Sequence, residues 1–106
     1  MSTSTKQTKT QKVPTWTFLS NHAHVLLCIA RNPEMTMKSI SELVGITERA
    51  VQRIVTELEE GGYLRRRKEG RRNRYEVTAS RPLRHSLERH CTTDALLAMV
   101  LGSPQR

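Results

Sequence analysis

The sequence is poor in several residue types that whole classes of function require. Its 106 residues include only two cysteines, Cys28 and Cys91, so a disulfide framework is excluded and we expect two buried thiols. Aromatic residues make up 4%, too few for a surface that stacks the bases of single-stranded nucleic acid. The longest apolar run, Ala95 to Leu101, is far shorter than the roughly 20 residues that span a bilayer, and Met1 to Lys12 has no apolar signal segment. We therefore expect a cytoplasmic protein with one folded domain and no membrane partner.

The side chains that build catalytic or metal sites are also missing or poorly spaced. No glycine-rich phosphate-binding loop is present, and Cys91 beside His90 is a sequence neighbour rather than a nucleophile with an oriented base. His22 and His24 lie two positions apart, on different faces of a helix. His85 and His90 lie five positions apart, which a helix does not align well either. The sequence predicts no enzyme activity, no metal ion and no cofactor.

Positive charge is abundant and concentrated. Eighteen lysines and arginines stand against 10 acidic residues, which gives a net charge of +8 and an isoelectric point near 10.3. This balance favours a polyanionic partner, nucleic acid before an anionic membrane surface. Seven basic residues fall within one short stretch, and they are Arg65, Arg66, Arg67, Lys68, Arg71, Arg72 and Arg74. Charge focused in this way indicates a contact surface.

The stretch from Thr47 to Glu60 has the apolar spacing of an amphipathic helix. Thr47 can cap its first turn, and Gly61-Gly62 suit the conformation in which helices end. Its outward side chains near the N-terminus can reach base edges or phosphates, and with the cap they are Thr47, Glu48, Arg49, Gln52, Arg53 and Thr56. Acidic residues that a duplex would repel occupy the other end. This stretch is the candidate recognition helix.

The preceding residues complete a helix-turn-helix pattern. Ser39 to Val44 predicts a helix with Ile40, Leu43 and Val44 on its inner side, and Gly45 permits a sharp turn before Ile46. An apolar first helix is expected from Ser20 or Asn21 to the Asn32-Pro33 break. Between these helices, Glu34 to Met37 predicts a short strand along the edge of a later hairpin.

After Gly62, the sequence predicts a hairpin, called the wing below. Tyr63 to Lys68 and Asn73 to Thr78 are strand-like runs, joined by a short loop in which Gly70 supplies a positive φ. Tyr75 and Val77 share one face of the second strand. The basic side chains expected to hold phosphates are Arg65, Arg67, Lys68, Arg71, Arg72 and Arg74.

The two ends of the chain differ in character from this central unit, residues 14–79. Residues 1–13 are expected to form a disordered basic tail. Residues 80–106 predict two helices, one beginning at Ser80-Arg81-Pro82 and one from Asp94 to Leu101. The second is apolar on all sides, which indicates burial against another subunit or, alternatively, against the first helix of the same chain. The side chains expected at a dimer interface are Leu96, Leu97, Met99 and Val100.

The order of elements resembles the winged helix-turn-helix fold, and Ser41 to Val77 resembles bacterial and archaeal regulators of the ArsR and MarR groups. The motifs are E-L-x-G-I-T before the recognition helix, L-E-x-G-G-Y-L after it, and R-x-x-E-G-R-x-x-x-Y-x-V in the wing, which is similar to the ArsR wing. The resemblance implies an α+β fold, mainly α with a small β-hairpin, whose recognition helix enters a major groove. It also implies that the wing tip, with Arg71 and Arg72, approaches a minor groove or its phosphates. Leu43 to Arg49 lack the C-x-C metal site of many ArsR regulators, so metal sensing is not implied.

We therefore hypothesise a dimeric, sequence-specific, double-stranded DNA-binding transcriptional regulator, associated with the nucleoid. The recognition helix would read a major groove, and the wing, Tyr63 to Thr78, would contact the backbone or a minor groove. Two alternatives stay open: a winged-helix module that binds RNA or a protein partner, and a nonspecific DNA-binding protein. No segment predicts a small-molecule pocket, so no effector is named.

Overall fold

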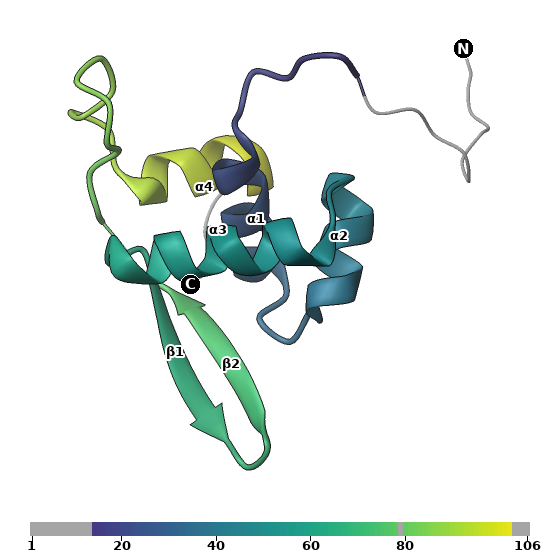
Figure 1. Cartoon of the computed structure of the whole chain (residues 1–106). Helices are drawn as coiled ribbons and strands as arrows, with labels where there is room; N and C mark the ends of the chain where they lie inside the picture. The colour runs from purple at the N-terminus through teal and green to yellow at the C-terminus, as the bar shows by residue number, and fades with distance from the viewer. Residues whose placement is uncertain (1–13, 79, 103–106) are drawn as a thin grey trace.

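The computed structural model describes residues 14–78 and 80–102, and the predicted tail of residues 1–13 lies outside these ranges. The helices and strands follow the order α1 (Asn21–Arg31), α2 (Met37–Val44), α3 (Glu48–Glu60), β1 (Leu64–Glu69), β2 (Arg72–Val77) and α4 (Thr93–Leu101). Helices α1, α2 and α3 form the helical body, and the β1–β2 wing projects from it beside the C-terminal end of α3 (Figure 1). The predicted fold, mainly α with a small β-hairpin, is confirmed.

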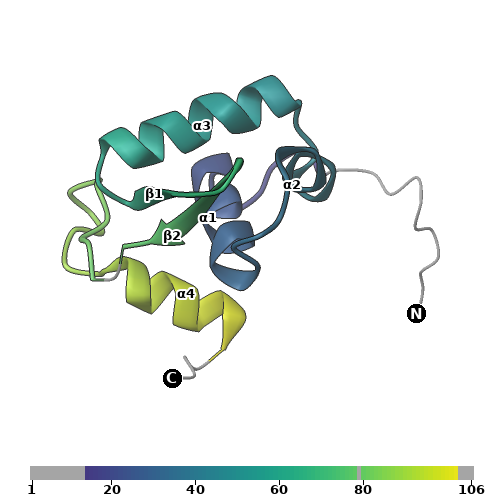
Figure 2. The ribbon, with the colours of Figure 1, turned by 90° about the horizontal axis from the view of Figure 1, so that it is seen from below.

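Helix α1 forms the centre of the core. Ser20 caps it, since its hydroxyl oxygen accepts a hydrogen bond from the Ala23 N–H. Its apolar stripe is buried against stripes from α2 and α3 and against the start of the wing. The buried cluster comprises Val25, Leu26, Ile29, Ile40, Val51, Ile54, Val55, Leu58, Tyr63 and Leu64. Helices α3 and α4 lie on opposite sides of α1 (Figure 2).

Helices α2 and α3 form the predicted helix-turn-helix. The Thr47 hydroxyl accepts a hydrogen bond from the Ala50 N–H at the start of α3, as expected for its cap. Gly45 ends α2 in the left-handed conformation, with φ of 89°, and Ile46 then packs against the core. Leu43 is 64% exposed, however, so its predicted place on the inner side of α2 is wrong. The eight-residue helix turns Ile40 inward and leaves Leu43 facing out.

The strand predicted for Glu34 to Met37 is also wrong. Thr36 is the N-cap of α2, and its side chain accepts a hydrogen bond from the Ser39 N–H. Met37 already belongs to the helix, which therefore begins two residues before the predicted start. A residue that caps a helix commits the following backbone to helical hydrogen bonds, and so the segment cannot extend along a strand.

The wing is an antiparallel pair whose register joins Leu64 to Val77 and Glu69 to Arg72. Gly70 and Arg71 form the turn, and Gly70 has φ of 65°, the conformation that the sequence predicted for this glycine. The strands begin and end within one residue of the predicted runs. Leu64 is buried and Tyr75 and Val77 pack on the core, so one end of the hairpin is anchored while the other projects.

The helix predicted from Ser80-Arg81-Pro82 is absent, because residues 80–92 form a closed loop. Its ends are joined by the Leu83 N–H donating to the Cys91 carbonyl oxygen and the Thr93 N–H donating to that of Arg81. Leu87 is 81% exposed, so the segment has no apolar stripe to bury, and helices of this length owe most of their stability to such burial. The C-terminal part of the described chain therefore contains one helix, α4, where two were predicted.

Candidate nucleic-acid interface

The N-terminal half of α3 presents the side chains predicted for the recognition surface. All six, Thr47, Glu48, Arg49, Gln52, Arg53 and Thr56, belong to exposed residues. The buried positions Val51, Ile54, Val55 and Leu58 hold the opposite face of the helix against the core, and so they determine which side chains point outward. The Thr47 hydroxyl oxygen already accepts the capping hydrogen bond, whereas Arg49 and Gln52 form no side-chain hydrogen bond or ion pair with any residue that the structure describes.

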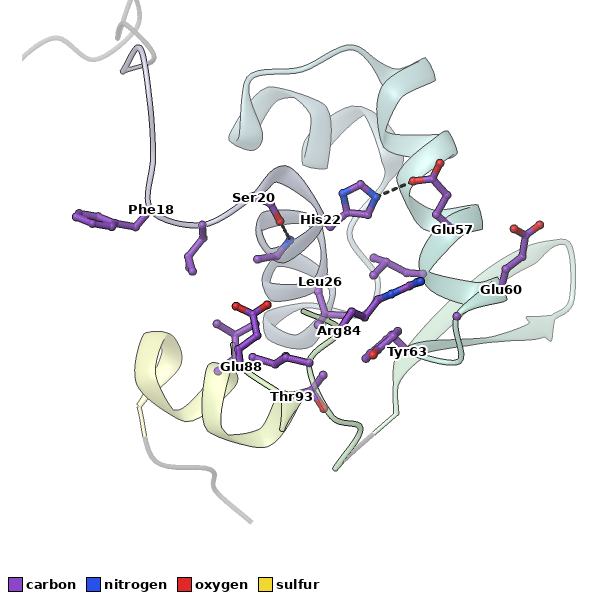
Figure 3. Close-up of a pocket in the computed structure, with 16 residues that line it drawn as sticks. Phe18, Ser20, His22, Leu26, Glu57, Glu60, Tyr63, Arg84, Glu88 and Thr93 are labelled. Carbon is purple, nitrogen blue, oxygen red and sulfur yellow. Dashed lines mark hydrogen bonds and ion pairs between the residues drawn. The ribbon is translucent and has the colours of Figure 1, made fainter. Parts of the chain in front are cut away.

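Arg53 differs from these residues because a carboxylate of the same helix lies beside it. Glu57 Oε2 lies 3.7 Å from Arg53 Nη1, and Glu57 Oε1 lies 2.7 Å from His22 Nε2 in α1 (Figure 3). The hydrogen bond with His22 lowers the pKa of Glu57; desolvation opposes this shift, and the nearby Arg53 charge adds a smaller lowering effect. The sequence did not predict the His22–Glu57 contact, because its partners lie 35 positions apart.

The wing arginines are not equivalent. Arg67 Nη1 donates to Glu76 Oε2 at 2.8 Å, a pair between neighbouring strands. Arg74 Nη1 lies 3.2 Å from Glu34 Oε2 and 3.7 Å from Glu69 Oε1. Each of these two guanidinium groups therefore already has a carboxylate partner.

A second group of wing side chains has no such partner. Arg65, Lys68 and Arg71 are exposed and form no ion pair with the residues in 14–78 and 80–102. Arg66, which was not among the predicted contacts, lies 3.5 Å from Glu59 of α3 and links the wing to that helix. The backbone of Arg72 pairs with that of Glu69 at the turn. Of the cations most available to a polyanion, Lys68 and Arg71 therefore lie toward the tip of the wing and Arg65 lies near its base.

A pocket that the sequence did not predict lies between α1, the C-terminal end of α3, the 83–88 segment and α4. Its volume is about 790 Å³, and apolar side chains such as Leu26 and Leu58 line it together with charged residues such as Arg84 and Glu88. Phe18 lies at its margin but points away from the other lining residues (Figure 3). The lining residues come from four separate parts of the chain, so no local sequence motif could have predicted the pocket.

Helix α4 packs on α1 with part of its surface and leaves the rest uncovered. Leu96 and Leu97 are half-buried, whereas Met99 and Val100 are exposed. The alternative prediction, that this helix packs on the first helix of the same chain, therefore describes one side of α4. Trp16 and Phe18 add a further apolar element, with ring centroids 5.1 Å apart in an edge-to-face arrangement and exposed fractions of 69% and 91%. The sequence prediction did not include these two aromatic residues in an interface.

Other kinds of site have little support in the described ranges. No three histidine, cysteine, aspartate or glutamate side chains lie together there in a way that could hold a metal ion. Cys28 and Cys91 are free thiols, each half-buried, and burial raises the pKa of Cys28. None of the helices in the same ranges is long and apolar enough to cross a membrane.

Comparison with known proteins agrees with this geometry. The family model described as the MarR family matches residues 17–74, which run from the approach to α1 through the helix-turn-helix into β2. No curated protein matches the sequence. The match covers more than half of the chain, and it joins the same elements that the structure assembles into three helices and a wing. The similarity of the wing to ArsR regulators stays a prediction. The chain belongs to the MarR family of winged helix-turn-helix DNA-binding transcriptional regulators.

Proposed function

We propose that this regulator is a homodimer that binds specific sequences of double-stranded DNA, with the N-terminal half of α3 in the major groove. The observation that carries the proposal is the outward face of α3, where Arg49 and Gln52 are exposed and unpaired in the described chain, next to a projecting basic wing. Three of the acidic residues of α3, Glu57, Glu59 and Glu60, lie in its C-terminal half, whereas both of its arginines and one glutamate, Glu48, lie in the N-terminal half. This polarity supports insertion of the N-terminal half, because a duplex attracts the arginines and repels the carboxylates.

Sequence discrimination would come from the side chains on this half of α3. An arginine can hold O6 and N7 of guanine with two hydrogen bonds, and a glutamine can do the same with N6 and N7 of adenine. We assign the first role to Arg49, assisted by Arg53, and the second to Gln52. Glu48 and Thr56 flank them. Glu48 would accept a hydrogen bond from the amino group of cytosine, and Thr56 would donate one to a phosphate. Thr47 also orients the first turn of the helix.

The wing would supply affinity that does not depend on sequence. Its proposed phosphate contacts are Arg65, Lys68, Arg71 and Arg72, with Arg67 and Arg74 nearby but already bound to carboxylates. Each phosphate contact releases condensed counterions, so the slope of log K against log salt should become shallower by about 0.9 when one contact is lost. Arg71→Ala should therefore weaken binding to every duplex and reduce that slope. An unchanged slope would contradict the assignment of Arg71.

Within residues 80–106, the segment predicted to dimerise, the dimer would form through α4 and not through the 80–92 loop, with the exposed aromatic pair beside it. Met99 and Val100 are the exposed members of the predicted set, and Leu96 and Leu97 would line its inner edge. Two protomers related by a two-fold axis could present their α3 helices about 34 Å apart, to successive major grooves of a palindromic site. Such a regulator would act in the cytoplasm, on nucleoid DNA.

One experiment tests the whole proposal. Duplexes bound by the purified protein are selected from a random pool, and the mass of the protein in solution is measured in parallel. A palindromic motif together with a dimer mass supports the proposal. If no motif is enriched, the protein binds DNA without sequence specificity and the proposal is wrong. If structured RNA competes more strongly than duplex DNA, the RNA-binding alternative is favoured.

A further inference from the structure

Arg74 occupies a special place in the wing because it connects β2 to a different part of the chain. Its Nη1 donates a hydrogen bond to Glu34 Oε2 at 3.2 Å, across 40 positions of sequence, and it lies 3.7 Å from Glu69 Oε1 in β1. The Arg74 side chain is 35% exposed, less than that of Arg67, its partner in the strand register. A single guanidinium group thus joins both strands of the wing to the turn between α1 and α2.

The turn that carries Glu34 is itself firmly held. The Asn32 side-chain oxygen accepts a hydrogen bond from the Glu34 N–H at 3.1 Å, and the Met35 N–H donates to the Asn32 carbonyl oxygen. Met35 packs on the core, and Thr36 caps α2 immediately afterwards. The Glu34 carboxylate is therefore carried by an ordered turn, and it can hold the neighbouring strand β2 in place.

The wing has few other restraints along its length. Its sheet has two strands, and the predicted third strand at Glu34 to Met37 does not form. Core packing holds Leu64, Tyr75 and Val77 at the base of the hairpin, and the Arg66–Glu59 pair restrains β1 from the side of α3. The Arg74–Glu34 contact restrains β2. A third strand would have held β2 by backbone hydrogen bonds, and here an ion pair between side chains holds it instead.

We propose that Glu34 is a positioning residue, which orients the wing relative to α3 by holding Arg74. The part of this inference that concerns DNA rests on the proposed function. Because two carboxylates already neutralise its charge, Arg74 serves mainly to hold β2 to Glu34 and contributes little as a phosphate ligand. The exposed cations Arg65, Lys68 and Arg71 contact the duplex, and the Glu34–Arg74 contact determines whether they reach it together.

A double-mutant cycle separates this role from direct DNA contact by Arg74. Glu34→Gln should weaken binding to the selected duplex by about two- to five-fold, the size expected when an exposed ion pair is lost, and make the salt slope shallower. Arg74→Gln should weaken binding similarly. In the Glu34→Gln background, Arg74→Gln should have no further effect beyond that of Arg84→Gln, which removes a positive charge from the 80–92 loop without breaking an ion pair among the described residues.

The matched control for Glu34 is Glu42→Gln. Glu42 is exposed on α2 and has no ion-pair partner among the described residues, so the substitution removes the same charge without touching the wing. Equal effects of Glu34→Gln and Glu42→Gln would show that only charge matters and would overturn the proposal. Additive losses for Glu34→Gln and Arg74→Gln would overturn it as well, because Arg74 would then bind DNA independently of Glu34.

A measurement without DNA tests the contact even if the proposed function fails. Backbone ¹⁵N relaxation should show lower order parameters for the wing residues from Lys68 to Asn73 in Glu34→Gln than in the wild type, while α1 and α3 keep theirs. Addition of salt should lower the wing order parameters of the wild type toward those of the variant, because screening weakens an exposed ion pair. Unchanged order parameters in Glu34→Gln would refute the positioning role. A wild type that binds no duplex, with the wing loosened as expected, would refute the proposed function alone.

Discussion

The guanidinium group of Arg81 lies over the ring of Tyr63, with 5.4 Å between its Cζ atom and the ring centroid. The same group donates a hydrogen bond from Nη2 to the carbonyl oxygen of Gly61, at the C-terminal end of α3. Gly62 has φ of 85°, and a Cβ at this position would lie 3.0 Å from Arg81 Nη2, so the absence of a side chain allows the close approach. A cation at this end of a helix also interacts favourably with the helix dipole. The 80–92 loop thereby caps the C-terminal end of α3.

Arg81→Ala should lower the free energy of unfolding by about 1 to 2 kcal/mol, the combined size of a cation–π contact and a hydrogen bond. For a domain of this size, each kcal/mol corresponds to a decrease in Tm of about 4 to 8 °C in thermal unfolding followed by circular dichroism. Arg84→Ala is the control, since Arg84 lies in the same loop and has no hydrogen-bond or ion-pair partner in the described ranges. Equal Tm values for the wild type and Arg81→Ala would contradict the capping role.

Arg49→Ala and Gln52→Ala should reduce discrimination more than overall affinity. Each should lose about 1 to 3 kcal/mol of preference for the selected duplex over a duplex altered at the base that it contacts, while binding to random DNA changes little. Competition titrations with the two duplexes measure the preference. Glu60→Gln serves as the control on the acidic half of α3, where preference should be retained. If Glu60→Gln lowers the preference as strongly, the N-terminal half of α3 does not read the bases.

The lowered pKa of Glu57 predicts a pH dependence of stability. The unfolded chain has the ordinary pKa of 4.5, so between the two values it binds more protons than the folded protein. The stabilising contribution is therefore complete above the unfolded pKa and is lost as the pH falls through the folded one. On acidification from about pH 6 to about pH 3, the Tm of the wild type should fall further than that of Glu57→Gln, which has no titrating carboxyl group. Parallel pH profiles would show that the His22 contact does not favour the ionised carboxylate in solution.

Met99→Glu should disrupt the proposed dimer. A carboxylate in the centre of an apolar contact loses its hydration, so the variant should have a monomer mass by light scattering and should bind a palindromic duplex no better than a single half-site. Leu87→Glu places the same charge on an exposed leucine of the 80–92 loop and should leave the dimer mass unchanged. A dimer mass for Met99→Glu would exclude α4 as the interface.

Features with local signals were predicted well. The cap at Thr47, the turn at Gly45 and the hairpin turn at Gly70 each depend on one side chain or one φ value, and each is where the sequence placed it. Segments with two competing local signals were predicted less well. Thr36 could end a strand or cap a helix, and its own hydrogen bond from the Ser39 N–H starts α2. Pro82 could begin a helix or enter a bridge, and there the pairing with Thr92, ten positions away, accompanies the loop.

The sequence by itself determined that this protein is a winged helix-turn-helix with exposed basic side chains on α3 and the wing, because helical periodicity, caps and turn residues act over a few positions. Only the tertiary structure decided which of those cations remain available. Arg74 and Arg67 have carboxylate partners, whereas Arg65, Lys68 and Arg71 have none in the described ranges. The physical reason is that an ion pair such as Arg74–Glu34 depends on how the core orients two distant segments. Chain folding, not local pattern, brings such groups within a few ångströms of each other.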